Sequence, residues 1–295
     1  MKTNRRSFLQ TSALSAGFLG VLPAMAAVPG KPPSFLLKKP TMRLGLVTYS
    51  LAQDWDIETI IKNCQAAGFD GVELRTTHAH KVEVNLSKAE RAKVRERFQN
   101  ADVQLMGLGS AFDYHTPDQA KLKQDIAATR EYILLAHDVG ATGVKVRPNA
   151  LPKEVSQEKT LEQIGRSLKE LGDFGDNLGI KIRLEVHGKD TALLPNIKTI
   201  MDVAAHRNVG VCWNSNQSDL DGQGFDYNFN LVKNKIFSVH MRDLYLEEYP
   251  FRKLLTRLNE VDFDGFCLAE IPASTDPVRV MKYFRSLWLA YQGLL

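Results

Sequence analysis

Four residues with oxygen or nitrogen donor atoms stand near the ends of four short apolar runs in the second half of the chain. They are Glu185 in KIRLEVH, Asn214 in VGVCWNSN, His240 in IFSVHMRD and Glu270 in GFCLAEIP. Two carboxylates, an amide oxygen and an imidazole suit a hard or borderline divalent ion. The residue types therefore predict one bound metal ion, with Mn²⁺ favoured and Mg²⁺, Co²⁺ or Zn²⁺ as alternatives.

Each of these residues also has an interpretation without a metal. Glu185 and Glu270 could be buried partners of neighbouring basic residues, and His240 a hydrogen-bonded core histidine. Asn214 could bond only a ligand or a sugar hydroxyl. Because acids inside a fold are costly unless they are paired or bound to a metal, we favour metal ligation for the two glutamates.

The runs that carry these residues alternate as barrel strands do. In 181–187 the aliphatic residues at 182, 184 and 186 share one face, whereas Arg183, Glu185 and His187 share the other. Three other runs place charged residues opposite aliphatic ones in the same way: Glu73, Arg75, Lys145, Arg147, His240 and Arg242. Aliphatic side chains suit the layer that faces helices, so the charged face should point into the barrel.

The chain from residue 43 onward alternates short β-rich runs with longer amphipathic segments. Strands are expected at 43–50, 71–75, 104–110, 143–148, 181–187, 209–216, 236–243 and 265–272. Helical patterns cover 56–67, 87–100, 118–139, 159–178, 226–233 and 276–290. This alternation predicts an α/β fold, a single (β/α)₈ TIM barrel over 43–295. The competing open sheet lacks a GxGxxG after its first strand, which argues against a dinucleotide-binding form.

The first 26 residues predict a signal peptide of the twin-arginine type. Arg5-Arg6 is followed by Ser-Phe-Leu, then by an apolar stretch from Leu14 to Leu22 and a small-x-small cleavage site at 24–26. An ordinary Sec signal or an uncleaved anchor is the alternative. Residues 27–42 are rich in Pro and Lys and are expected to form a linker. We expect an exported, periplasmic protein with no stable membrane insertion after cleavage.

Composition and charge give little support to other classes of protein. The 295 residues are 44% hydrophobic and 24% charged, which is ordinary for a soluble globular protein. The net charge is +4, and the leader supplies three basic residues and no acid. The balanced remainder argues against nucleic-acid binding. The three cysteines lie in apolar settings without CxxC spacing, so zinc–thiolate chemistry is not expected.

Four motifs, GVELR, VGVCWN, SVHMRDL and LAEIP, resemble strands of the xylose isomerase-like TIM-barrel family of sugar phosphate isomerases and epimerases, over 43–290. The resemblance implies metal ligands Glu185, Asn214, His240 and Glu270. The family usually has Asp where this chain has Asn214, so the site loses a negative charge, which Asp219 could replace. The many His and Asp ligands of the related endonuclease IV are missing, which excludes DNA repair.

The resemblance implies proton abstraction next to a carbonyl, through an enediolate, as in a metal-dependent sugar isomerase or epimerase. Glu185 and Glu270 would remove and return the proton, and His187 would contact the substrate or act as acid or base. Further substrate contacts are expected from Lys145, Arg242, His115, Trp55 and Asn216. Loop histidines are often merely solvated, and aromatic residues such as Trp55 often pack in lids, so these contacts have a simpler alternative.

Two other functions are compatible with the same residues. One is a lyase that cleaves 3-keto-glycosides by β-elimination, with His187 as base, which export favours because glycosides are plentiful outside the cytoplasm. The other is a non-catalytic sugar-binding protein, although a one-domain barrel lacks a hinged cleft. In each case the expected partner is a small carbohydrate. The sequence is also compatible with a homo-oligomer.

Overall fold

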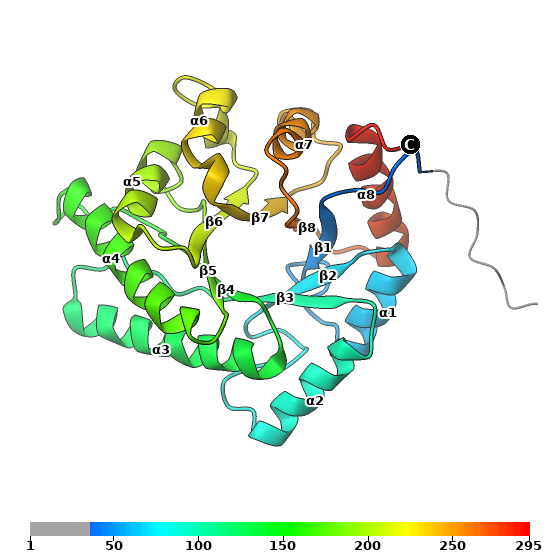
Figure 1. Ribbon diagram of the computed structural model, residues 1–295, viewed down its shortest axis with the longest axis horizontal. Helices are drawn as coiled ribbons and strands as arrows, with labels where there is room; N and C mark the ends of the chain where they lie inside the picture. Colours follow the sequence, from blue (N-terminus) through cyan, green and yellow to red (C-terminus); the bar gives the residue numbers. More distant parts are fainter. Residues whose placement is uncertain (1–35) are drawn as a thin grey trace, which may run out of the picture. The chain divides into compact units, whose positions relative to one another are not determined.

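The computed structural model describes residues 36–295, so the predicted signal peptide and residues 27–35 of the predicted linker lie outside it. Within the described range, eight parallel strands close into a barrel in the order β1 to β8, and helices surround it (Figure 1). The predicted single (β/α)₈ barrel is confirmed. None of the helices in 36–295 is long and apolar enough to cross a membrane.

Seven of the eight strands are shorter than the runs that predict them, and β2 has the predicted bounds. The strands are β1 Arg43–Val47, β2 Gly71–Arg75, β3 Gln104–Gly109, β4 Gly143–Val146, β5 Lys181–Glu185, β6 Val209–Asn214, β7 Ile236–Met241 and β8 Phe266–Ala269. As a result His187, Arg242 and Glu270 follow their strands and do not belong to them. These residues occupy the carboxyl end of the barrel, where loops carry the chemistry of barrel enzymes.

The helices alternate with the strands along the chain. They are α1 Ile57–Ala67, α2 Lys88–Gln99, α3 Gln119–Val139, α4 Gln157–Asp176, α5 Leu194–Ala204, α6 Phe225–Val232, α7 Phe251–Glu260 and α8 Pro277–Tyr291. Asp56, Ser87 and Asp118 cap their helices through side-chain oxygens. Gly68 and Gly140 end α1 and α3 in the left-handed conformation that glycine adopts without strain. Helices α5 and α7 are not among the predicted segments.

The main apolar core lies between the strands and the surrounding helices. Inside the barrel, by contrast, the apolar filling is a small cluster of Val47, Met106, Phe266 and Leu268. Charged or polar side chains are also buried in strand positions opposite the aliphatic ones: Glu73, Lys145, Arg183, Glu185 and His240. The strand alternation therefore predicts the interior face correctly.

The first described residues run beside the end of the chain. Leu37 donates its backbone N–H to the carbonyl oxygen of Leu294 at 3.1 Å. Met42, at the end of the predicted linker, is 2% exposed and packs in the main core. Residues just before β1 thus pack with the main core and bond to the end of the chain.

Candidate active site

Three predicted ligands come together at the carboxyl end of the barrel. Glu185 ends β5, His240 lies in β7 and Glu270 directly follows β8. One ligand atom from each lies within 4.8 Å of the other two. Strand register explains the convergence, because His240 pairs with Asn214 on β6 and with Leu268 on β8.

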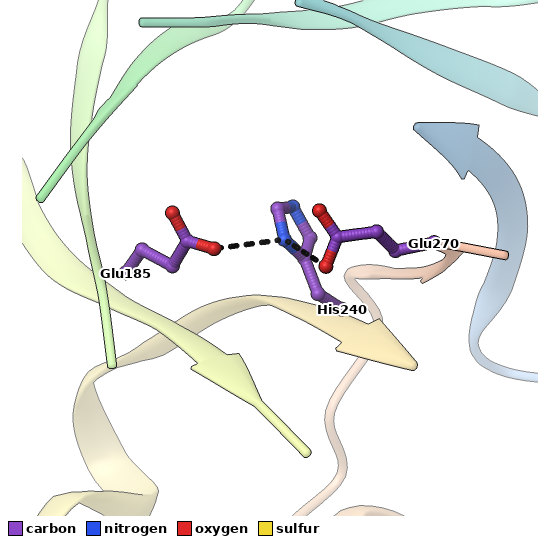
Figure 2. Close-up of side chains that lie close together, drawn as sticks. All are labelled: Glu185, His240 and Glu270. Carbon is purple, nitrogen blue, oxygen red and sulfur yellow. Dashed lines mark ion pairs between the residues drawn. The ribbon is translucent and has the colours of Figure 1, made fainter. Parts of the chain in front are cut away.

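The two carboxylates approach the same nitrogen of His240 from opposite sides (Figure 2). His240 Nδ1 lies 3.6 Å from Glu185 Oε1 and 3.7 Å from Glu270 Oε2. The imidazole is 1% exposed, whereas the Glu270 side chain is 18% exposed. Glu270 is therefore the member of the trio most open to a substrate.

Lys145 fixes the orientation of Glu185. Its Nζ donates to Glu185 Oε2 at 2.6 Å, and both side chains are almost fully buried. Burial by itself would raise the pKa of Glu185, but Lys145 and His240 together outweigh it and hold that pKa well below its usual range. Glu185 is thus ionised, with Oε1 left facing His240.

A fourth acid, Glu73 on β2, lies beneath the trio. Its Oε1 is 3.3 Å from His240 Nε2, the ring nitrogen that faces away from the other carboxylates. Glu73 is fully buried, which by itself would raise its pKa, yet His240, Lys145 and Arg183 together lower it. Room for its carboxylate comes from Gly109 on β3, where a Cβ would stand 2.8 Å from Oε1. The strand pattern predicts that Glu73 faces the barrel interior but indicates no role for it.

The donor set fits a divalent cation. Two carboxylate oxygens and one imidazole nitrogen surround a single point, and His240 Nδ1 is buried without a hydrogen-bond partner among the described residues. A buried nitrogen without a partner is rare in folded proteins unless a ligand or ion satisfies it. Glu185, His240 and Glu270 would hold such an ion, with His240 using Nδ1.

A cavity of about 670 Å³ opens above these residues, a size suited to a small-molecule ligand. Seven predicted site residues line it: Lys145, Glu185, His187, Asn214, Asn216, Arg242 and Glu270. The lining also includes residues to which sequence reasoning gave no site role: Tyr49, Arg75, Arg147, Ser215, Gln217, Asp243, Leu246 and Pro272. Carboxylates, cations and amides surround the cavity, which suits a hydroxyl-rich ligand.

A family model, the xylose isomerase-like TIM barrel, matches residues 61–287. The chain belongs to this family. The zinc-bound IolI protein is similar over 85% of this chain and 98% of its own, with 17% identity and a TM-score of 0.71. D-psicose 3-epimerase solved in the presence of D-fructose is similar over 85% and 100%, with 14% identity and a TM-score of 0.71.

A third structure in this family fold is the 3-keto-D-glucoside 4-epimerase YcjR from E. coli. It is similar over 84% of this chain and 99% of its own, with 12% identity and a TM-score of 0.70. No curated protein matches the chain. At these identities the structural neighbours share the fold of the barrel, and several of them are sugar epimerases.

Asn214 lies beside the trio of Glu185, His240 and Glu270 and contacts one of its carboxylates. Its Nδ2 is 3.5 Å from Glu185 Oε1, so the amide presents its donor to that oxygen. Asp219 does not replace the missing charge, contrary to the alternative raised from sequence. It is fully buried, accepts from the Tyr249 hydroxyl at 2.6 Å and from Asn216 N–H at 3.1 Å, and is not a member of the metal cluster.

Two predicted substrate contacts are not brought to the cavity. His115 pairs through Nδ1 with Asp113 at 2.9 Å, and Trp55 packs partly buried against the main core. Neither residue lines the cavity in residues 36–295. Each lies in a loop, and loop conformation decides where such a side chain points. The expectation that His115 and Trp55 line the cavity is therefore corrected. Asn216, by contrast, does line the cavity, and its side-chain amide donates to the Val186 carbonyl at 2.6 Å.

His187 lines the cavity two residues beyond the end of β5. Burial lowers its pKa, and Arg147, Lys145 and Arg75 lower it further while Glu185 opposes them. Its Nδ1 is buried and has no hydrogen-bond partner among residues 36–295. A neutral imidazole with a free nitrogen can accept a proton from a bound substrate.

Asp219 should make stability depend on pH. Burial raises its pKa to about 8, so the folded protein keeps a proton that the unfolded chain releases near pH 4. Stability from this group is fully present at low pH and is lost as the pH rises through about 8. We expect the melting temperature of the Asp219→Asn variant to fall less than that of the wild type between about pH 5 and pH 9. Parallel melting curves for the two proteins would contradict this assignment.

Proposed function

We propose that the protein is a metal-dependent sugar isomerase or epimerase that removes a proton next to a carbonyl group. The observation that carries this proposal is the placement of the Glu185 and Glu270 carboxylates on opposite sides of His240, at the floor of the cavity. Two carboxylates on opposite sides of one substrate carbon can take a proton from one face and return it to the other.

The chain's own residues support this chemistry. Lys145 binds Oε2 of Glu185 and helps to hold the carboxylate ionised, while Oε1 faces His240. Glu270 reaches the cavity with a partly exposed carboxylate, and His187 adds a neutral proton acceptor at the wall. A divalent ion held by the trio would stabilise negative charge that develops on the substrate's oxygens.

Sugar epimerases among the structural neighbours support a carbohydrate substrate with a carbonyl group. One is described as a D-psicose 3-epimerase and another as a 3-keto-D-glucoside 4-epimerase. Both epimerisations fit removal and return of a proton. The volume of about 670 Å³ leaves room for a monosaccharide and a substituent.

Exchange of substrate protons with solvent deuterium tests the proposal. Purified protein with Mn²⁺ is incubated in D₂O with free ketoses, aldoses and 3-keto-glucosides, and the α-proton is followed by NMR. We expect deuterium at the α-carbon with at least one sugar class, and no exchange after the metal is removed with EDTA. Release of the aglycone from a 3-keto-glucoside would instead identify the lyase. Neither exchange nor release with any class would identify a binding protein.

We also propose export through the twin-arginine route, which carries proteins that have already folded. Folding first would let the metal be loaded in the cytoplasm, where availability and not intrinsic affinity selects the ion. Replacing both Arg5 and Arg6 with lysine should leave folded precursor inside the cell, as measured by fractionation and immunoblotting. Undiminished export of that variant, or zinc at full occupancy in active native protein, would defeat the proposal.

A further inference from the structure

Two arginines in the cavity wall lack an acidic partner. Arg75 is the last residue of β2 and Arg147 directly follows β4, and both line the cavity. Among residues 36–295, neither has a carboxylate within ion-pair distance, unlike Arg242, whose Nη1 is 3.5 Å from Glu248. A guanidinium is always charged and prefers a planar oxygen anion as its partner. The two arginines therefore offer unused donors to a ligand.

Their remaining contacts are weak. The guanidinium carbon of Arg75 lies 5.3 Å from the ring centre of Tyr49. Arg147 donates one long hydrogen bond, 3.4 Å, to the Ala111 carbonyl, and its Nε is buried without a partner. These contacts restrain the two side chains, and guanidinium N–H groups of both arginines remain available to a ligand.

The barrel places both arginines on the side of the cavity away from His240. Strand β3 lies between β2 and β4, and in a ring of eight strands it stands opposite β7, which carries His240. Gly109 ends β3, pairing with Arg75 on one side and Lys145 on the other. A Cβ at Gly109 would lie 3.2 Å from Arg75 Cγ. With no side chain at that position, the Glu73 carboxylate and the stem of Arg75 occupy the space beside β3.

The cavity lining also has more positive than negative side chains. Its cations are Arg75, Lys145, Arg147 and Arg242, and its acids are Glu185, Asp243 and Glu270. Lys145 is neutralised by Glu185, so the surplus falls on the β2–β4 side. A divalent ion at the trio would make the whole cavity still more positive. Such a cavity attracts anions and concentrates them near the site.

We infer that the substrate is an anionic carbohydrate whose carboxylate or phosphate group is bound by Arg75 and Arg147. This inference rests on the proposed function, in which the reacting carbonyl end lies over Glu185, His240 and Glu270. The anionic group would then sit at the other end of the sugar, across the cavity. Its role is to fix the distance and direction from which the reacting carbon reaches the two carboxylates.

Calorimetric binding to the full protein with Mn²⁺ added tests this inference with three related ketoses: D-fructose, D-fructuronate and D-fructose 6-phosphate. We expect one anion to bind roughly 10-fold or more tightly than D-fructose, because hydrogen bonds to charged groups are the stronger class. The better of the two anions identifies the group as carboxylate or phosphate. The double variant Arg75→Gln/Arg147→Gln should lose the preference, whereas Arg166→Gln, an exposed arginine on α4, should keep it.

Equal affinity for the neutral and anionic ketoses, no binding of either anion, or a preference that survives in the double variant would overturn the inference. Circular dichroism and a Mn²⁺ titration establish that the double variant is folded and binds metal. The binding preference and the deuterium exchange are separate measurements, so each proposal can fail without the other. If neutral sugars exchange deuterium and no anion is preferred, the inference of an anionic substrate is wrong and the proposed reaction stands. If an anion is preferred but no sugar exchanges deuterium, the proposed reaction is wrong and the anion-binding role of the two arginines stands.

Discussion

The Glu270→Gln variant is expected to lose turnover by ~10²–10⁴-fold, the usual effect of removing a general acid or base. Glutamine keeps the shape of the side chain but cannot carry the proton, and it removes one anionic donor from the trio. The rate of solvent-deuterium incorporation into the substrate measures the loss. The matched control is Glu162→Gln, because Glu162 pairs with Arg166 on the exposed face of α4 and should leave the rate unchanged.

Glu185→Gln should lower the rate by a similar ~10²–10⁴-fold and should also destabilise the fold. Its carboxylate pairs with Lys145 in a buried setting, so the variant leaves an uncompensated positive charge. Breaking one side of such a pair costs about 3–5 kcal/mol, which chemical denaturation can measure. Near-normal activity in either variant would show that another residue, with His187 the first candidate, removes the proton.

Glu73→Gln is expected to weaken metal binding by roughly 10–100-fold, as loss of a partner to a metal-binding histidine does. Glu73 Oε1 faces His240 Nε2 at 3.3 Å, so it favours the tautomer with its proton on Nε2 and a free Nδ1. Glutamine preserves volume and one acceptor oxygen but removes the charge that holds this tautomer. Zn²⁺ titration by calorimetry gives the affinity.

Nitrogen chemical shifts of His240 in the same protein report the tautomer directly, a property that a merely structural role for Glu73 would not change. The matched control is Glu96→Gln, an exposed position on α2. An unchanged dissociation constant together with unchanged His240 shifts would contradict the role given to Glu73.

The barrel and its metal trio follow from the sequence because strand geometry is regular. Side chains alternate faces along a strand, so the run 181–187 indicates which residues enter the barrel. Helices α5 and α7 are harder to predict. Neither begins with a side-chain cap, and the residue before α7 is Pro250. Both helices are short, at 11 and 10 residues, and no cap marks where they begin, even though the apolar residues of α7 share one buried face. Packing of that face against the barrel stabilises such short helices.

The roles of individual polar residues depend on contacts that sequence does not show. Glu73 shares its strand parity with Arg75, yet only the closed barrel brings Glu73 beneath His240. In the sequence, Asp219 is a candidate metal ligand close to Asn214. In the fold, its carboxylate instead accepts a hydrogen bond from the hydroxyl of Tyr249, thirty positions later. His115 and Trp55 are placed by loops, whose paths no periodic pattern fixes. Strand residues are therefore predicted well and loop residues poorly.

A crystal structure of the protein with Mn²⁺ added, with anomalous differences measured near the manganese edge, tests most directly that Glu185, His240 and Glu270 hold one metal ion. We expect a single strong peak about 2.0–2.6 Å from Glu185 Oε1, His240 Nδ1 and Glu270 Oε2. A map without a peak between these three side chains, or a peak bound by other residues, would contradict it.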